Sequence, residues 1–401
     1  MKFGTLVLCG ITLMIMASGA PAREIWVAKT GSDANDGDQS APYLTINHAA
    51  QQAMPGDRVT VRAGTYREWV KPVLGGLSES SRITYRAAPG EDVRIIGSEP
   101  VTGWERSGNL WQVTLPDSFF GDMNPFSTSI RNPDEIGESS DDPAREWGWL
   151  MYGRWAHLGD VYLDGEGLTE QETSEGLSAP MTWHVTSEQG QTTITANFGD
   201  ANPNAAQVEV NVRPHAFFPV TPGLGYITVR GFKMLNTATW WAPPIVFQPG
   251  AIGPNGGHHW IIEHNLVRHA KTVCISLGNP SGKADVTLSG RHIVRHNILH
   301  KCGQAGIAGQ RWNSYSHIHD NIIEQINYRN EFGGYETAGI KFHHATGSLI
   351  EHNFIHDVSS TEGFSGHGIW IDFKNRDIRI TRNVLYRVSG ISIYMEANWG
   401  G

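Results

Sequence analysis

The sequence GHGIWIDFKNRDIRITRNVLYRVSGISIYMEANWG, from Gly366 to Gly400, decides the fold of this chain. It contains three short runs in which apolar residues recur at every second position, at 368–372, 378–385 and 390–396. A period of two indicates β-strands, because successive side chains of a strand point to opposite faces. No part of the stretch has the period of a helix, so we expect three successive short strands.

The same pattern recurs upstream along the chain. Isoleucines open a series of comparable strands: Ile245, Ile275, Ile307, Ile340, Ile369 and Ile391. A second series reads WIIEHNLV, HIVRHNIL, HIHDNII, LIEHNFI and IRITRNVL, and it places asparagines at equivalent positions: Asn265, Asn297, Asn321, Asn353 and Asn383. Asparagine tolerates left-handed backbone at turns, and stacked asparagine side chains can bond one another in a ladder. A repeat of roughly 20–35 residues with strand periodicity indicates a parallel β-helix solenoid.

The chain divides into four segments. Residues 1–22 have the basic residue, apolar run and small-residue cleavage site of a signal peptide, so we expect a secreted or periplasmic protein. Residues 23–99 read as the first coils, with a capping helix near 46–54 whose N-cap is Thr45. Residues 100–222 lack the repeat and read as an inserted β-rich subdomain, and the solenoid resumes over 223–401. The last coil ends without a cap, so we expect a fragment whose remaining coils are absent.

Composition excludes some partners and leaves others open. The net charge is −9 without a basic block, which argues against nucleic acid. No stretch is long and apolar enough to anchor the chain in a membrane, and the sequence leaves a homo-oligomer open. Cys274 and Cys302 read either as buried hydrophobic residues or as a disulfide. The acidic residues at 33–38 read as a polar turn in preference to a calcium site, and we assign neither metal nor cofactor.

The outward face of the isoleucine series predicts the functional site. Large aromatic, amide and charged residues share it: Gln310, Trp312, Lys341, His343, Trp370, Asp372, Tyr394 and Glu396. Such a face suits an oligosaccharide, which needs apolar plates and planar hydrogen-bonding groups, and an ordinary hydrated β-face is the alternative. The dense Trp and Arg residues of 145–155 could reach the same site or simply pack within the insertion.

Asp372 and Glu396 are the candidate catalytic pair. Aligned on Gly368 and Gly390, Glu396 lies two residues beyond the level of Asp372. That offset adds about 6.6 Å to a strand spacing of about 4.8 Å, and leaning side chains would bring the carboxyls to roughly 5–6 Å. This estimate favours a retaining over an inverting glycosidase. Lys341 and His343 should keep Asp372 ionised, so we expect the raised pKa on Glu396.

Four segments resemble glycoside hydrolase family 120: ETAGIKFHHA (336–345), GIWIDF (368–373), RITRNVLYR (379–387) and YMEANWG (394–400). The resemblance implies an all-β fold, a right-handed parallel β-helix solenoid with an inserted β-sandwich-like subdomain. It also implies a β-xylosidase that releases xylose from xylo-oligosaccharides. By the same resemblance Asp372 is the nucleophile, Glu396 the acid/base and Glu336 a supporting acid.

Two other functions stay open from the sequence. A polysaccharide lyase acting on uronate polymers could use Lys341 as its base and an arginine such as Arg311 as its acid. A non-catalytic glycan-binding solenoid would use the same face without turnover. Gly366-His367-Gly368 also occurs in polygalacturonase-like sequences, but the paired aspartates expected one coil earlier are missing.

Overall fold

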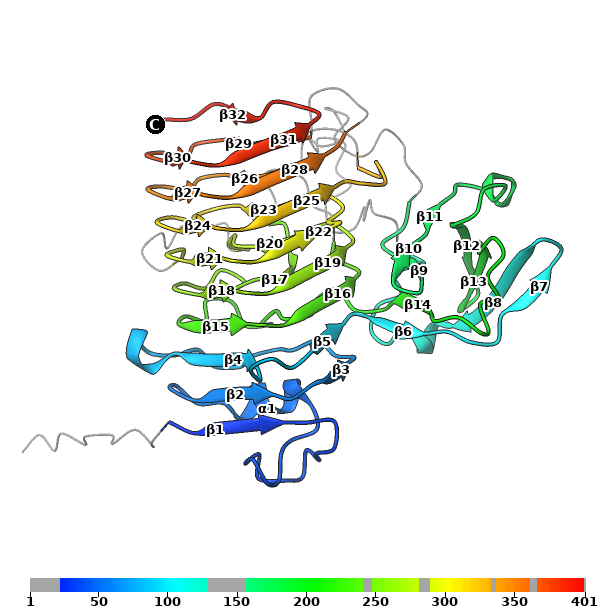
Figure 1. The fold of residues 1–401 in the computed structure, drawn as a ribbon, viewed down its shortest axis with the longest axis horizontal. Helices are drawn as coiled ribbons and strands as arrows, with labels where there is room; N and C mark the ends of the chain where they lie inside the picture. The colour runs from blue at the N-terminus through cyan, green and yellow to red at the C-terminus, as the bar shows by residue number, and fades with distance from the viewer. Residues whose placement is uncertain are drawn as a thin grey trace, which may run out of the picture.

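The computed structural model describes residues 22–128, 156–240, 247–280, 289–332, 337–360 and 366–399. Its main body is a stack of coils whose strands form three parallel sheets (Figure 1), and the third sheet begins only with the coil of β15 (Ile227–Arg230). The first sheet contains, in spatial order, β1 (Glu24–Val27), β2 (Arg58–Val61), β4 (Ile83–Ala87), β15 (Ile227–Arg230), β18 (Ile261–Glu263), β21 (Ile293–Arg295), β24 (His317–His319), β27 (Leu349–Glu351) and β30 (Arg379–Thr381).

The second sheet follows the first along each coil. It contains β3 (Gly64–Tyr66), β5 (Val93–Ile96), β16 (Lys233–Thr237), β19 (Leu266–Ala270), β22 (Ile298–His300), β25 (Ile322–Ile326), β28 (Phe354–Val358) and β31 (Val384–Val388). The third sheet contains β17 (Gly250–Ile252), β20 (Val273–Ser276), β23 (Ala305–Gly309), β26 (Ala338–Phe342), β29 (His367–Ile371) and β32 (Ile393–Met395). The predicted parallel β-helix is therefore confirmed.

Stacked isoleucines fill the interior behind the third sheet. Ile275 pairs with Ile307, Ile307 with Ile340 and Ile340 with Ile369, and all four are fully buried. Each such burial stabilises the fold by about 1.5–3 kcal/mol relative to exposure. The predicted isoleucine series was wrong at its first member, Ile245, and at its last, Ile391. Ile252 pairs with Ile275 in place of Ile245, which lies outside the described residues.

At the other end of the series, Ile393 pairs with Ile369, and Ile391 precedes the strand. Ile391 is 42% exposed, Ile393 44% and Met395 46%, so the predicted interior face of this coil is not buried. No described strand lies beyond β32 to cover these side chains.

The asparagine ladder is confirmed, with one correction. Each asparagine Nδ2 donates to the Oδ1 of the next: Asn265 to Asn297 at 3.1 Å, Asn297 to Asn321 at 3.0 Å, Asn321 to Asn353 at 2.9 Å and Asn353 to Asn383 at 2.9 Å. The left-handed backbone, however, belongs to the residue before each asparagine: His264, His296, Asp320, His352 and Arg382. These five residues, three of them histidines, therefore occupy the strained turn position, while the asparagines bond between coils.

A helix covers the first coil, as predicted. Helix α1 (Ile46–Gln52) starts after Thr45, whose hydroxyl accepts a hydrogen bond from His48 N at 3.1 Å. Ile46 and Ala49 of the helix are fully buried against the coil interior. The Thr45 hydroxyl satisfies one of the free N–H groups at the start of the helix. The helix itself covers the apolar end of the stack.

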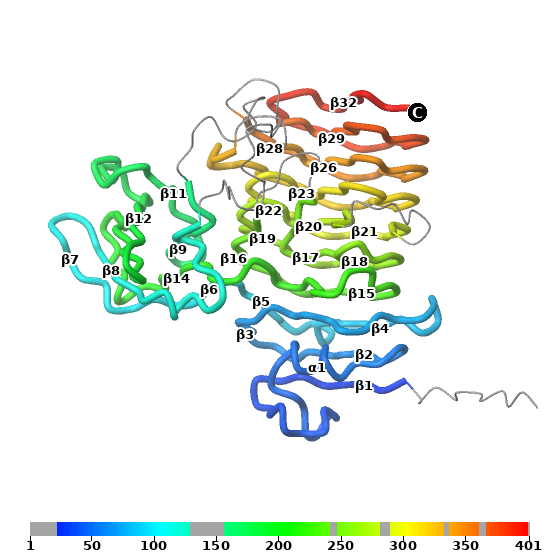
Figure 2. Tube along the Cα trace, turned by 180° about the vertical axis from the view of Figure 1, so that it is seen from behind, coloured from blue at the N-terminus to red at the C-terminus, as the bar shows by residue number. Residues whose placement is uncertain are grey.

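The insertion forms two small sheets beside the coils, as Figure 1 and Figure 2 both show. One contains β6 (Ser98–Pro100), β14 (Val208–Asn211), β9 (Val161–Leu163) and β10 (Glu166–Gly167). The other contains β7 (Glu105–Ser107), β8 (Leu110–Pro116), β13 (Gln191–Asn197), β12 (Thr182–Glu188) and β11 (Thr169–Glu170). Three short 3₁₀ turns complete the described elements: η1 (Glu79–Ser81), η2 (Asp117–Phe119) and η4 (Ser174–Gly176).

Buried ion pairs fix the insertion to the solenoid. Lys271 Nζ lies 3.0 Å from Asp160 Oδ1, and Arg329 Nη2 lies 2.8 Å from Asp160 Oδ2. Lys301 Nζ reaches Glu166 Oε2 at 2.6 Å nearer the surface. Breaking a buried ion pair leaves a buried charge without a partner, which is energetically costly. These contacts should therefore hold the insertion and the solenoid in one orientation. The Trp- and Arg-rich segment 145–155 lies outside the described residues.

Cys274 and Cys302 form a disulfide. Both cysteines are fully buried and lie on neighbouring coils, so the bond ties two coils together covalently. Of the two alternatives left open by the sequence, the structure has the disulfide. Within the described residues no helix is long and apolar enough to cross a bilayer.

Candidate active site

Four polar side chains form a row where the strands of the third sheet end. Gly309, Phe342, Ile371 and Met395 are aligned across adjacent strands. The next residue of each coil therefore falls in line, and we call this set the edge row: Gln310, His343, Asp372 and Glu396. The solenoid thus brings together side chains that lie many residues apart in the sequence.

Asp372 and Glu396 are level with each other, which corrects the predicted offset of two residues. The prediction aligned Gly368 with Gly390, whereas the pairing of Trp370 with Tyr394 shifts the register by two. Glu396 N donates to Ile371 O at 2.9 Å, so the alignment continues beyond the end of β32. The backbones at Asp372 and Glu396 are then separated only by the strand spacing of about 4.8 Å.

Two cationic or potentially cationic groups hold Asp372. Lys341 Nζ and His343 Nε2 each lie 3.1 Å from Asp372 Oδ2. Burial alone would raise the pKa of Asp372, but the Lys341 ammonium and the contact with His343 outweigh it and lower that pKa well below its usual range. Asp372, which is 9% exposed, is therefore an ionised carboxylate at neutral pH.

Glu396 lies in the opposite electrostatic environment. Burial and then the negative charge of Asp372 raise the pKa of Glu396, and a hydrogen bond between the two carboxyl groups acts in the same direction. Trp370 Nε1 donates to Glu396 Oε2 at 3.2 Å and opposes part of this shift. Two neighbouring carboxyls with pKa values pushed apart can serve as a base or nucleophile and an acid, respectively.

The side chains behind the pair are tightly packed. Lys341 Nζ lies 3.5 Å from the centre of the Trp370 ring, and both residues are 1% exposed. The ring of Tyr394 lies 5.7 Å from that of Trp370. Trp370 and Lys341 were predicted to contact the sugar, but in the structure Trp370 bonds Glu396, Lys341 pairs with Asp372, and both have almost no free surface.

Two other predicted residues have different positions. Gln310 is buried at the edge row, next to His343. Trp312 lies in the turn after β23 rather than on the strand face, with its ring 5.5 Å from that of His344. Glu336, the predicted supporting acid, lies outside the described residues.

His367 lies beside the carboxyl pair but was not among the predicted site residues. Its ring lies 4.6 Å from Trp370 and 5.0 Å from Tyr394, and its Nδ1 accepts a hydrogen bond from Ile391 N at 2.9 Å. Burial, followed by the nearby Lys341 charge, lowers the pKa of His367 to about 4. A neutral His367 therefore supports the packing behind the carboxyl pair. Its place one residue before the GIWID run was the available signal.

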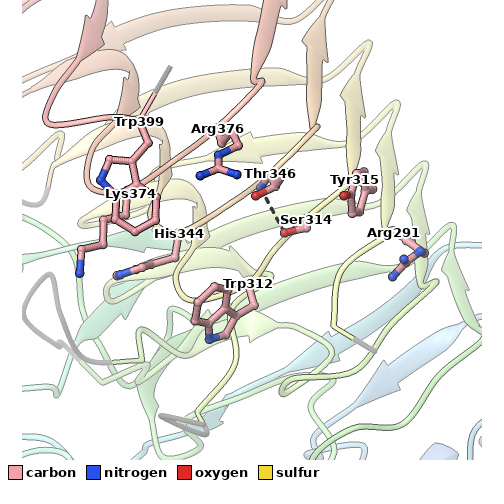
Figure 3. Close-up of a pocket in the computed structure, with 9 residues that line it drawn as sticks. All are labelled: Arg291, Trp312, Ser314, Tyr315, His344, Thr346, Lys374, Arg376 and Trp399. Atoms are coloured by element: carbon pink, nitrogen blue, oxygen red, sulfur yellow. Dashed lines mark hydrogen bonds between the residues drawn. The ribbon is translucent and has the colours of Figure 1, made fainter. Parts of the chain in front are cut away.

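A second missed feature is a pocket in the turns just beyond the edge row (Figure 3). Its volume is about 600 Å³. We call it the turn pocket, and its lining residues are Arg291, Trp312, Ser314, Tyr315, His344, Thr346, Lys374, Arg376 and Trp399. His344, Lys374 and Trp399 come one, two and three residues after His343, Asp372 and Glu396. These residues lie in different turns, and only the alignment of the coils in the structure shows that the turns are neighbours.

The described residues contain no group of three or more His, Cys, Asp or Glu side chains placed to hold a metal ion. In the acidic turn at 33–38, Asp33 Oδ1 accepts hydrogen bonds from the N–H groups of Leu44 and Thr45 at 2.9 Å. Asp38 Oδ1 likewise accepts from Ser40 N and Ala41 N at 2.8 Å. These bonds give both side chains a role in the turn.

Two family models match the chain. The insertion domain of glycoside hydrolase 120 matches residues 101–182, and the right-handed β-helix region matches residues 250–399. Among curated proteins, the uncharacterised protein YwoF of Bacillus subtilis strain 168 is 36% identical over 73 residues, which is 18% of this chain and 15% of YwoF.

Solved structures share the fold over nearly the whole chain. XylC, solved in complex with xylose, is 37% identical with a TM-score of 0.83, and the match covers 94% of this chain and 64% of XylC. The lacto-N-biosidase of family GH136 from Eubacterium ramulus has a TM-score of 0.51 at 11% identity, over 92% of this chain and 57% of that one. The second likeness concerns the fold alone.

The chain thus spans less than two thirds of the length of XylC. Within that span it has the two parts that the sequence resemblance implied, an insertion and a right-handed β-helix. The resemblance to glycoside hydrolase family 120 is therefore confirmed.

Proposed function

We propose that this protein is a retaining glycoside hydrolase that releases xylose from xylo-oligosaccharides. The observation that carries the proposal is the level placement of Asp372 and Glu396 on adjacent strands, where Lys341 and His343 hold Asp372. The pKa of Asp372 is lowered there and that of Glu396 is raised. The match to the family insertion domain and to XylC, which was solved with xylose, supports the choice of sugar.

In the first step, Glu396 gives its proton to the oxygen of the leaving group. Asp372 attacks the anomeric carbon, the glycosidic bond breaks and a covalent glycosyl-enzyme forms. Lys341 and His343 hold the attacking carboxylate in one orientation and keep it ionised. Positioning by such fixed groups lowers the barrier because little reorganisation remains at the moment of reaction.

In the second step, Glu396 acts as a base. It takes a proton from a water molecule, whose oxygen attacks the anomeric carbon, and Asp372 leaves as a carboxylate. Bonding Asp372 to the sugar removes its negative charge, so the pKa of Glu396 should fall between the two steps. Two inversions give a product with retained configuration.

The close approach of the carboxyls favours retention over inversion. Retaining enzymes hold the two groups about 5–5.5 Å apart, whereas inverting enzymes need about 6.5–9.5 Å to admit a water molecule between carboxylate and sugar. Side chains that start from level positions on adjacent strands, with backbones about 4.8 Å apart, suit the shorter separation.

A lyase is the less suitable alternative. Its base would be Lys341, yet this ammonium is 1% exposed, ion-paired with Asp372 and packed on Trp370. A base must reach a proton of the substrate in its unprotonated form, and these contacts oppose both requirements.

We further propose that the protein is exported. The apolar segment at residues 1–22 has the pattern of a signal peptide. The Cys274–Cys302 disulfide supports an oxidising compartment.

A panel of nitrophenyl glycosides tests the activity directly. We expect the β-xyloside to be hydrolysed in preference to glucosides, galactosides and arabinosides, with loss of turnover in Asp372→Asn. Ultraviolet absorbance of uronate polymers during incubation provides the second arm, because a lyase creates a conjugated double bond. An absorbance rise without glycoside hydrolysis would replace the proposal by the lyase, and turnover of neither substrate would favour a glycan-binding solenoid.

A further inference from the structure

We propose that the turn pocket binds an acidic sugar unit, a uronate, joined to the xylose chain next to the bond that is cleaved. This inference rests on the proposed function and names the class of substrate more closely. It follows from the position, the charge and the aromatic lining of the pocket.

The pocket adjoins the reacting carboxyls. His344 follows His343 directly, and the rings of the two histidines lie 6.5 Å apart. Lys374 comes two residues after Asp372 and Trp399 three residues after Glu396, so the pocket is built from the same coils as the edge row. A substrate held at the carboxyl pair could extend into it without leaving the protein surface.

The lining has a strong positive bias. It includes Arg291, Lys374 and Arg376 and no acidic residue, in a protein whose net charge is −9. Within the part of the chain that the structure describes, neither Lys374 nor Arg376 forms an ion pair with a carboxylate. Two cations such as Lys374 and Arg376, without a carboxylate partner among the described residues and on an acidic protein, attract an anionic ligand.

Aromatic rings accompany these cations. Lys374 Nζ lies 5.5 Å from the centre of the Trp399 ring, and the Arg376 guanidinium lies 5.8 Å from the same centre. Figure 3 shows Trp399 and Trp312 on either side of His344 and Lys374. Flat apolar rings suit the faces of sugars, as the charges suit a carboxylate. Guanidinium groups in particular match the two oxygens of a carboxylate.

A simple inorganic anion would not need the aromatic walls, and a neutral sugar would not need the charges. A volume of about 600 Å³ also exceeds what a small ion requires and falls in the range of ligand pockets. The combination points to a sugar that carries a carboxylate.

The test compares a neutral xylo-oligosaccharide with one of equal length that bears a glucuronosyl substituent. The full chain should show a higher kcat/KM for the acidic substrate. The double substitution Lys374→Met and Arg376→Met should reduce the acidic-to-neutral ratio of kcat/KM by roughly 10- to 100-fold, the usual effect of losing charged hydrogen bonds.

Arg382→Gln is the matched control. This arginine lies on the turn between the first and second sheets, its side chain is 67% exposed, and its substitution removes a positive charge from the same coil as Arg376. The ratio should stay unchanged in this variant. A ratio that falls equally in the control would indicate a general effect of charge and would overturn the pocket assignment.

The remaining outcomes separate this inference from the proposed function. Hydrolysis of nitrophenyl β-xyloside with no preference for the acidic oligosaccharide would overturn the uronate pocket and leave the hydrolase intact. If neither oligosaccharide is cleaved, calorimetric binding of the same pair to the Asp372→Asn protein decides. Tighter binding of the acidic sugar, lost in the double variant, supports the pocket, and equal binding overturns it.

Discussion

Two edges of the solenoid differ in how they use the same repeat. Between the first and second sheets, one residue type recurs from coil to coil, and each asparagine from Asn265 to Asn383 bonds to the next. At the end of the third sheet each of the last four coils carries a different polar residue: Gln310, His343, Asp372 and Glu396. Every coil must hydrogen-bond to the next, so the same residue type can serve at each turn. Stacking does not require unlike polar residues at equivalent positions of successive coils, and we infer that these residues serve catalysis.

The largest effect should come from a charge in the stacked interior. Ile371→Asp buries an unpaired carboxylate at a position with no exposure, and we expect a loss of more than about 4 kcal/mol or no folded protein. Ile393→Asp is the matched variant, because the same substitution one coil later falls on a side chain that is 44% exposed. Its unfolding temperature should change far less. Equal losses in circular dichroism melts would mean that the two coils are buried alike.

Within the edge row, Asp372→Asn should leave the fold in place and remove activity. The amide keeps the shape of the carboxylate but cannot form the glycosyl-enzyme, so kcat should fall by roughly 10⁴-fold or more on every leaving group. Steady-state kinetics on several nitrophenyl xylosides, with melting curves as a control for folding, provide the measurement. Substantial activity in this variant would exclude Asp372 as the nucleophile.

Glu396→Ala should have a smaller effect that depends on the substrate. Loss of the proton donor should cost about 10²–10⁴-fold on poor leaving groups and much less on good ones, which depart without a proton. Azide can then attack the glycosyl-enzyme without a general base and give a glycosyl azide of retained configuration. If azide instead rescues an Asp372→Ala protein and yields the inverted azide, the two roles are exchanged.

The pH profile of kcat/KM should be bell-shaped. Activity needs Asp372 ionised and Glu396 protonated, so it should fall at low pH as Asp372 gains a proton. It should fall again above the raised pKa of Glu396, since the acid is then lost. In Glu396→Gln the basic limb should disappear for substrates with good leaving groups. Persistence of an unchanged basic limb would assign it to another residue.

The smallest expected effect belongs to the repeated edge. Asn321→Ala removes bonds to two neighbouring coils and should lower stability by about 1–3 kcal/mol, because buried backbone and amide groups lose their partners. Its kcat should remain close to that of the unchanged protein. Urea unfolding and initial rates measured on one preparation would reveal any coupling between the ladder and the edge row.

The sequence was informative wherever the repeat was regular. Alternation and spacing predicted the stacked parallel strands, and they predicted the ladder from Asn265 to Asn383. They also placed Asp372 and Glu396 on one face. The register between these two strands could not be predicted, because Ile391 and Ile393 both fit the alternation and only the stacking of Trp370 on Tyr394 distinguishes them.

The turn pocket was not predictable for a related reason. Lys374, Arg376 and Trp399 lie in turns of irregular length, where the pattern gives no alignment between coils. Likewise, Trp370 looked like an open sugar-binding ring. Its burial depends on Lys341 and His367, which come from the strand beneath and from the start of its own strand.

The anomeric configuration of the first product tests the central claim most directly. Proton NMR during hydrolysis of a nitrophenyl β-xyloside distinguishes α- from β-xylose before the two interconvert. The level placement of Asp372 and Glu396 on adjacent strands predicts β-xylose first, followed by slow appearance of the α form. If α-xylose appears first, the reaction inverts, and the close pair Asp372 and Glu396 cannot act as nucleophile and acid/base.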